Sequence, residues 1–360
     1  MGRARRPVRT MAGAQFALVL ISGVIGVTLL ALAFGRIGSN EVLASIASLR
    51  WAGVGILALG GLRFAVRALA WTLCVDPPER LGFRPALAAF IAGDALATLI
   101  PVGPLASEPA KVFAVRSDLR AGTAVSTIAV ETLLYGLSVG FMLAGGGMAF
   151  LASVDEGGHL RVAIMSAILA CVIVAVLLAL AAGTSSRPLA RLLSNRGTTQ
   201  ARRPSVRAWV GRTLALEGRV FGFARSDRTR WLGILALEGC HHVVGVLEVW
   251  WTLVAVLPPQ VRPSLRDAFV LEAVNRLITL VFKMVPLRVG FDEVGSGIAA
   301  KALALGSMAG VSLALVRKIR ILFWTGIGLS VLLAQGWSWR HPGGRDVGRA
   351  AETTQRDHDG

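Results

Sequence analysis

The chain has 360 residues, 54% of them hydrophobic, and a formal net charge of +17 carried mostly by arginine. Several stretches approach the ~20 apolar residues that span a bilayer, so the composition excludes a water-soluble globular protein. It predicts an all-α, polytopic membrane protein. The basic segments hold few aromatic residues, which excludes a nucleic-acid-binding domain. The three cysteines form no CxxC pair, and we expect small core residues rather than a disulfide framework.

The first apolar run, Phe16–Phe34, follows a basic N-terminus. Ala31-Leu-Ala33 is similar to a signal-peptidase site, but the run is longer than a usual signal-peptide core and many apolar stretches follow it. We therefore expect an uncleaved first transmembrane helix. Taken together, the apolar stretches predict spans over residues 15–35, 51–73, 121–151, 162–183, 231–257 and 312–336.

Two further apolar stretches, 86–107 and 266–310, are interrupted by matching polar motifs. In each motif a proline precedes a glutamate by seven residues and a cation follows that glutamate by eight: Pro101, Glu108 and Arg116 in the first, Pro286, Glu293 and Lys301 in the second. Proline and glycine end helices, and paired broken segments in corresponding halves indicate a substrate site between inverted repeats. The sequence therefore predicts two inverted repeats, each containing a re-entrant broken helix.

The positions of the arginines indicate which side of the membrane each loop occupies. Residues 184–230 carry eleven arginines, and cytoplasmic loops collect Lys and Arg. With the basic N-terminus inside, this loop is cytoplasmic only if the first broken segment enters and leaves on one side. The second then re-enters from the outer side, and both termini are cytoplasmic. We expect a first membrane repeat over 1–183, a basic cytoplasmic loop over 184–230, a second membrane repeat over 231–340 and a disordered cytoplasmic tail over 341–360.

Polar side chains gather around both motifs. Glu108 and Lys111 share a helix face, and Arg116 follows them. Three interpretations stay open: a cradle for a lipid head group, a proton-coupled carboxylate, or an ion pair that anchors the re-entrant loop. A polar stripe at helical spacing leads into the second motif and continues beyond it. This stripe either lines a water-filled groove or forms an interhelical salt-bridge network, and its members are Glu272, Asn275, Arg276, Thr279, Lys283, Arg288, Asp292 and Glu293.

Charged residues also lie in the apolar spans that precede the motifs, and their signs are opposed between the halves. The span before the first motif holds Arg63 and Arg67, whereas the span before the second holds Glu238, His241 and Glu248. Glu238 and His241 match one Glu-x-x-His pair of di-iron bundles; without a second pair, we expect a hydrogen-bonded buried pair and no metal. A guanidinium binds two phosphate oxygens at once, so the expected phosphate contacts are Arg63, Arg67, Arg276 and Arg288.

The segments Pro-x-Gly-x-x-x-Ser-Glu (Pro101–Glu108) and Pro-x-x-x-Gly-x-Asp-Glu (Pro286–Glu293) resemble the lysylphosphatidylglycerol synthase transmembrane region, a flippase-like domain family, over about residues 10–340. The second motif departs from the family pattern, which carries more glycine where this chain has Leu287 and Arg288. We expect no soluble aminoacyl-transferase domain, for which 360 residues leave no room. The resemblance therefore does not imply synthesis of lysylphosphatidylglycerol.

The resemblance implies a lipid flippase or lipid transporter of the bacterial inner membrane that handles a polar lipid at a midplane site between the two re-entrant segments. The expected partners are membrane lipids with anionic or zwitterionic head groups, together with a homo-oligomer or a cytoplasmic lipid-synthesis partner. We expect neither a cofactor nor enzymatic activity. Two alternatives stay open: a membrane-embedded lipid-modifying transferase or its membrane subunit, and a scaffold that recruits a cytoplasmic partner through the basic loop.

Overall fold

The computed structural model describes Leu49 and residues 51–99, 103–153, 165–166, 227–283 and 285–339. These residues form α-helices and one short 3-10 helix, with no strand among them, which confirms the all-α prediction. The predicted span 15–35, all of the span 162–183 except residues 165–166, nearly all of the basic loop, the C-terminal tail and Pro101 of the first motif lie outside the described residues.

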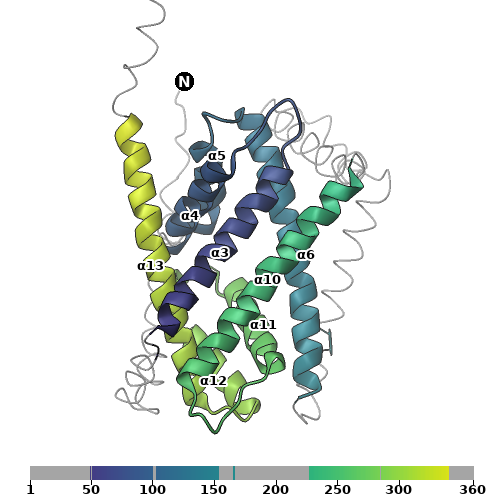
Figure 1. Ribbon diagram of the computed structural model, residues 1–360, viewed down its shortest axis with the longest axis vertical. Helices are drawn as coiled ribbons and strands as arrows, with labels where there is room; N and C mark the ends of the chain where they lie inside the picture. The colour runs from purple at the N-terminus through teal and green to yellow at the C-terminus, as the bar shows by residue number, and fades with distance from the viewer. Residues whose placement is uncertain are drawn as a thin grey trace, which may run out of the picture.

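Among the described helices, three are long and apolar enough to cross a membrane: α3 (Ala52–Leu73), α6 (Ala121–Leu151) and α10 (Arg228–Val256). At about 1.5 Å per residue, the 22 residues of α3 reach ~33 Å, which exceeds the ~30 Å hydrocarbon core of a bilayer. They match the predicted spans 51–73, 121–151 and 231–257. The predicted span 312–336 lies inside α13 (Ser307–Trp339), which is not one of the three. Figure 1 shows α3 and α10 packed together and running in opposite directions through the middle of the molecule.

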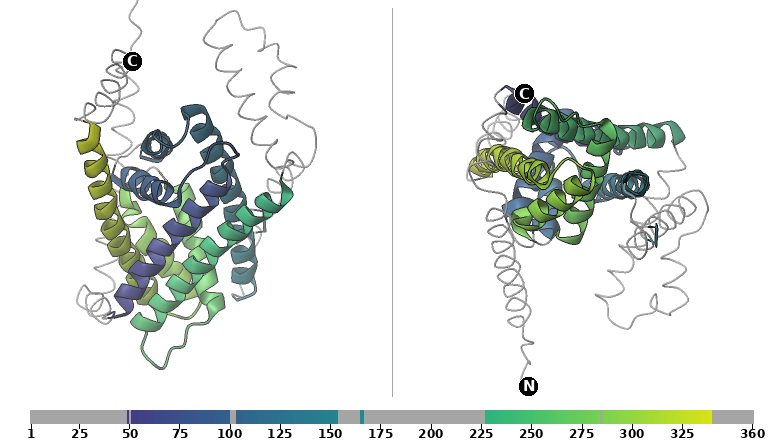
Figure 2. Two further views of the ribbon diagram at one scale, coloured as in Figure 1. Left: turned by 45° about the horizontal axis from the view of Figure 1, so that its top comes forward. Right: turned by 90° about the horizontal axis from the view of Figure 1, so that it is seen from below.

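The two interrupted stretches each form a pair of shorter helices. The first pair is α4 (Phe83–Leu99) and α5 (Gly103–Ala114). The second is α11 (Leu265–Val281) and α12 (Phe291–Ala302), joined through the 3-10 helix η2 (Pro286–Arg288). The members of each pair pack on one another. In Figure 1 and in the left view of Figure 2, α4 and α5 lie at the upper end of the molecule, whereas α11 and α12 lie at the lower end.

Local chemistry determines where the second pair begins. Ser264 and Asp267 form a capping box at the start of α11, in which each side chain accepts a hydrogen bond from the other residue's backbone N–H. At the other end of the connection, the Glu293 carboxylate accepts from the backbone N–H of Gly290 at 2.7 Å and so caps α12. The motif glutamate is therefore part of the helix start itself.

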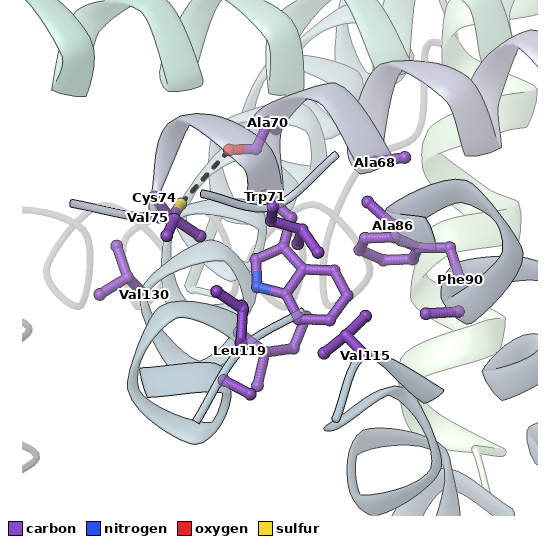
Figure 3. Packing of buried hydrophobic residues seen from close by; sticks show 14 of the residues in the cluster. Ala68, Ala70, Trp71, Cys74, Val75, Ala86, Phe90, Val115, Leu119 and Val130 are labelled. Atoms are coloured by element: carbon purple, nitrogen blue, oxygen red, sulfur yellow. Dashed lines mark hydrogen bonds between the residues drawn. The ribbon is translucent and has the colours of Figure 1, made fainter. Parts of the chain in front are cut away.

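An apolar cluster joins α3, α4 and α6 near the first helix pair (Figure 3). Trp71 is fully buried there, meets Phe90 edge to face with ring centroids 5.8 Å apart, and donates from its indole N–H to Thr127 Oγ1 at 3.1 Å. Cys74 is buried in the same cluster, as predicted for the cysteines. Cys240 contradicts that prediction, because it is exposed on α10.

Candidate functional site

The described helices bury charge and expose apolar side chains. The carboxyl-bearing residues Glu131, Glu238, Glu272 and Glu293 are all fully buried, at 0% exposure. In contrast, Trp51, Phe141, Leu333 and other large apolar side chains are exposed. Such a distribution suits a hydrocarbon solvent, in which ionisable groups turn toward the protein interior and mark functional sites.

Glu272 on α11 lies at the centre of the largest buried charge cluster. Its carboxylate accepts hydrogen bonds from Arg276 Nε at 3.0 Å, from Arg63 at 3.1 Å and from Arg317 at 3.4 Å, and Arg276 Nη2 lies 2.9 Å from it. Asn275 donates to the same carboxylate at 3.3 Å. The predicted residues of α3 and α11 are thus brought together, and the interaction between Glu272 and Arg276 follows the predicted i, i+4 pairing.

Glu248 on α10 extends this cluster. It pairs with Arg63 at 3.2 Å and with Arg320 of α13 at 2.8 Å. We call these six residues the arginine cluster. It contains four cations, Arg63, Arg276, Arg317 and Arg320, and two anions, Glu248 and Glu272. Within the described part of the chain, Arg317 Nη1 and Arg320 Nε are buried nitrogens without a hydrogen-bond partner. Buried donors of this kind are rare and need an acceptor.

The second motif forms a separate cluster beside α13. Lys318 donates to Glu293 at 2.6 Å and lies 3.6 Å from Asp292, which also pairs with Arg288 at 3.2 Å. The backbone leading into α12 has positive φ at Leu287 (52°) and Arg288 (47°). Glycine adopts this conformation at low cost, so two larger residues occupy a glycine-type turn where the resemblance led us to expect more glycine.

The first motif lies at the opposite helix pair. Lys111 donates to Glu108 at 2.9 Å, as their shared helix face predicts, and its ammonium group sits 4.4 Å from the centroid of the Phe90 ring. Glu108 and Arg116 line an apolar groove of about 720 Å³ between α5 and α6, together with Phe113 and other apolar side chains. Beyond the motif, the η2 turn of the second segment packs against α4, so the two broken segments meet inside the molecule.

The remaining predicted residues lie apart from these clusters. Arg67 pairs with Glu131 of α6 at 2.6 Å, and Lys283 is exposed. The predicted hydrogen-bonded pair of Glu238 and His241 is wrong. Both side chains are buried, but the His241 ring contacts Arg63 and Arg276, whereas neither carboxylate oxygen of Glu238 has a hydrogen-bond partner among the described residues.

Sequence reasoning missed the contribution of α13 to the site. Arg317, Lys318 and Arg320 hold the carboxylates of both buried clusters, yet none of them was a predicted site residue. The signal was present, since three cations within four residues interrupt an otherwise apolar span, and intramembrane cations face the interior. In the described residues, no group of three His, Cys, Asp or Glu side chains is arranged to hold a metal ion.

These features define an α-helical membrane protein with an interior rich in buried ion pairs and a pair of short packed helices at each end. The chain belongs to the lysylphosphatidylglycerol synthase TM region family, whose model matches residues 19–259. The matched range contains the first motif and ends before the second, short of the extent to 340 that the motifs suggested. Searches of curated proteins and of solved structures found no match.

Proposed function

We propose that this chain is a lipid transporter of the flippase type, which moves or handles an anionic or zwitterionic lipid across the bacterial inner membrane. The observation that carries the proposal is the arginine cluster, in which four guanidinium groups share the carboxylates of Glu248 and Glu272, and Arg317 Nη1 and Arg320 Nε have no described hydrogen-bond partner. A lipid phosphate supplies both the missing charge and the missing acceptors. Membership of a family named for a lipid-modifying protein's membrane region supports a lipid as the ligand.

The proposed architecture is a pair of inverted repeats, and one sequence offset supports it. Shifting the numbering by 185 residues carries Pro101 to Pro286 and Glu108 to Glu293. The same shift brings the bounds of α4, α5 and α6 within three residues of those of α11, α12 and α13. Figure 1 shows α6 and α13 running in opposite directions, as α3 and α10 do.

A salt bridge supplies independent support for the repeats. Arg63 and Glu248 are 185 residues apart and pair at 3.2 Å. Residues related by a two-fold axis touch each other only where the axis passes between them. The proposed axis therefore runs through the arginine cluster, at the interface of the repeats, which is where transporters of inverted-repeat design bind their substrates.

In the proposed topology both helix pairs are re-entrant and enter from opposite faces. The end of the molecule that carries α4 and α5 is cytoplasmic, and residues 257–264 face outward. A cysteine at Asp118 should then react with a membrane-impermeant maleimide only after the cytoplasmic side is opened, and one at Val261 should react in intact spheroplasts. Reversed labelling, or labelling of both from one side, contradicts re-entry.

The proposed mechanism exchanges internal ion pairs for contacts with the lipid. Arg276 and Arg288 each hold a carboxylate, and a phosphate with the same charge can replace it. The head group meets Glu108, Lys111, Arg276 and Glu293 near the midplane, while acyl chains stay in hydrocarbon or in the groove between α5 and α6. Rocking of one repeat against the other around the broken segments then exposes the head group to alternate sides.

Reconstitution tests this function directly. Proteoliposomes containing a fluorescent phosphatidylglycerol are treated with an impermeant quencher, and the fraction of quenchable lipid is followed over time. We expect wild type to move lipid, and Glu108→Gln and Glu293→Gln to slow it more than they reduce folded protein in the membrane. An Asp118→Asn variant, altered at an exposed loop carboxylate, is the control. Transport at the wild-type rate by both motif variants removes these residues from the site, and no transport by wild type refutes the function.

A second candidate is the membrane subunit of a lipid-modifying enzyme, which the description of the matching family favours. It makes a different prediction for the same vesicles. Mass spectrometry of the extracted lipids should show unchanged masses for a transporter, whereas a modifying subunit supplied with a cytoplasmic extract should yield lipids of altered mass.

A further inference from the structure

The most isolated acid in the described interior is Glu238 on α10. Its side chain is fully buried, and neither carboxylate oxygen meets a donor in the described part of the chain. Another acid, Glu131 of α6, is equally buried and lies one helical turn before Tyr135. The Tyr135 ring stacks on His242, one turn after Glu238 on α10, with centroids 6.0 Å apart, and the two helices run in the same direction in Figure 1, so the two acids face each other across one interface. A carboxylate left unpaired at membrane depth is strongly unfavourable.

One cation serves both acids. Arg67 of α3 donates from Nε to Glu131 Oε1 at 2.8 Å, and its Nη2 lies 2.6 Å from the same oxygen. The guanidinium lies over the Tyr135 ring, 3.8 Å from its centroid, and also over the Phe90 ring, 4.9 Å from its centroid. The ion pair with Glu131 and the two ring contacts together hold the Arg67 guanidinium beside Glu131 and not beside Glu238. Two ionised carboxylates beside one guanidinium leave an unbalanced negative charge.

In the described part of the chain, no cation other than Arg67 forms an ion pair with either acid; Arg230, which acts on Cys74, pairs with Asp76 and Asp227. Cys74 at the end of α3 lies within electrostatic range of both acids, and Tyr135 lies on α6. On α10 itself, His242 bonds to Ser138 through Nε2 at 3.0 Å, and His241 contacts two arginines through its Nε2. Since arginine can only donate, His241 Nε2 accepts, and this ring is neutral.

We propose that Glu131 and Glu238 share one proton and form an intramembrane proton-binding site that is coupled to anion binding at the arginine cluster. One proton, taken from water, gives the two carboxyl groups a common charge of −1, which Arg67 balances. It also supplies the hydrogen bond that Glu238 lacks. Carboxyl groups in contact share a proton for the same reason in other proteins.

The coupling passes through Tyr135. Its ring faces Arg67, and its hydroxyl accepts a hydrogen bond from Arg276 Nη1 at 2.9 Å. Arg276 belongs to the arginine cluster through Glu272. Release of the proton places an additional negative charge close to Tyr135 and Arg276. This charge weakens the attraction of the arginine cluster for an anionic ligand. Proton binding and anion binding therefore favour one another, and the effect is reciprocal. The coupling between proton binding and anion binding rests on the proposed function; the proton site itself does not.

Infrared spectroscopy of the purified full-length protein in lipid nanodiscs tests the proton site without any transport assay. We expect a protonated-carboxyl band at neutral pH that shifts in heavy water. Glu238→Gln and Glu131→Gln should each remove it, and Asp118→Asn should retain it. Gln at position 238 keeps a donor for Glu131, so that variant should fold. The absence of the band in wild type, or its persistence in both Gln variants, overturns the proposal.

Retention of phosphatidylglycerol in native mass spectrometry tests the coupling. Wild type should retain less of this lipid as the pH is raised from mildly acidic to alkaline, and Glu238→Gln should lose this dependence. Equal pH dependence in both proteins overturns the coupling. If no variant retains the lipid at any pH, the coupling and the proposed function both fail, and the infrared band alone then decides whether the proton site stands.

Discussion

Replacing Glu272 with Gln should destabilise the protein severely, because this carboxylate balances most of the arginine cluster. Arg276, Arg63 and Arg317 all lie between 2.9 and 3.4 Å from it, and the residue is fully buried. The substitution keeps the shape but removes the charge, and its amide group places new donors against side chains that can only donate. Glu248 then remains as the single acid of the cluster.

The size of the effect follows from the burial. Removing one partner of a buried ion pair costs about 3–5 kcal/mol, since the other charge stays buried without compensation. Three arginines lose a partner here, so we expect a value at the upper end of that range. An exposed pair contributes only ~0–1 kcal/mol. The free energy of unfolding can be measured by titrating dodecyl sulfate into detergent micelles and following tryptophan fluorescence.

A compensating change and a control complete this test. Arg317→Met should restore part of the stability lost in Glu272→Gln, because it removes one uncompensated cation. Asp118→Asn, at an exposed carboxylate, should unfold as wild type does. A loss below about 1 kcal/mol in Glu272→Gln, the range of solvated pairs, refutes the conclusion that the cluster is dry and that Glu272 compensates its arginines.

Two further predictions concern lipid contact and helix packing. Arg276→Lys or Arg288→Lys should each retain less phosphatidylglycerol than wild type in native mass spectrometry, because lysine loses the two-pronged hydrogen bonding of arginine; retention equal to wild type favours purely structural ion pairs. Gly310→Ala should destabilise by about 1–3 kcal/mol in the same unfolding titration, because its new methyl group would collide with the α12 backbone. Gly326→Ala, in the same helix and with no described atom near its new methyl, should be neutral or stabilising by up to ~1 kcal/mol. Equal effects of the two alanines contradict the packing argument.

Features determined by neighbouring residues were predictable from the sequence. The bounds of α6 agree with the prediction at both ends, and those of α3 and α10 agree within three residues. Length and hydropathy decide a membrane-spanning helix, and no distant contact is needed. The interruption before Glu293 was predictable for a similar reason, because proline and glycine end a helix wherever they occur.

The partners of the buried charges were not predictable in the same way. Lys318 follows Glu293 by 25 residues and holds it at 2.6 Å, but spacing of that size favours no particular pairing. For Glu238, in contrast, a contact was predicted that the structure does not contain. Its neighbour His241 shares the helix face, yet the structure directs the histidine toward arginines of other helices and the glutamate toward another acid. These contacts are determined by tertiary packing. The sequence predicts only that each buried charge needs a compensating partner, and not which residue provides it.

The proposed inverted repeats explain why corresponding positions in the two halves of the chain carry charges of opposite sign. A residue close to a two-fold axis faces its own equivalent, so two identical cations at that position would repel each other in a low-dielectric interior. The chain instead has Arg63 in one half and Glu248 in the other, and they pair across the proposed axis. Sequence similarity between the halves is therefore expected to be weakest next to the axis, where charge must be complementary. It should be strongest at the broken segments, where each half needs the same proline and glutamate to end one helix and begin the next.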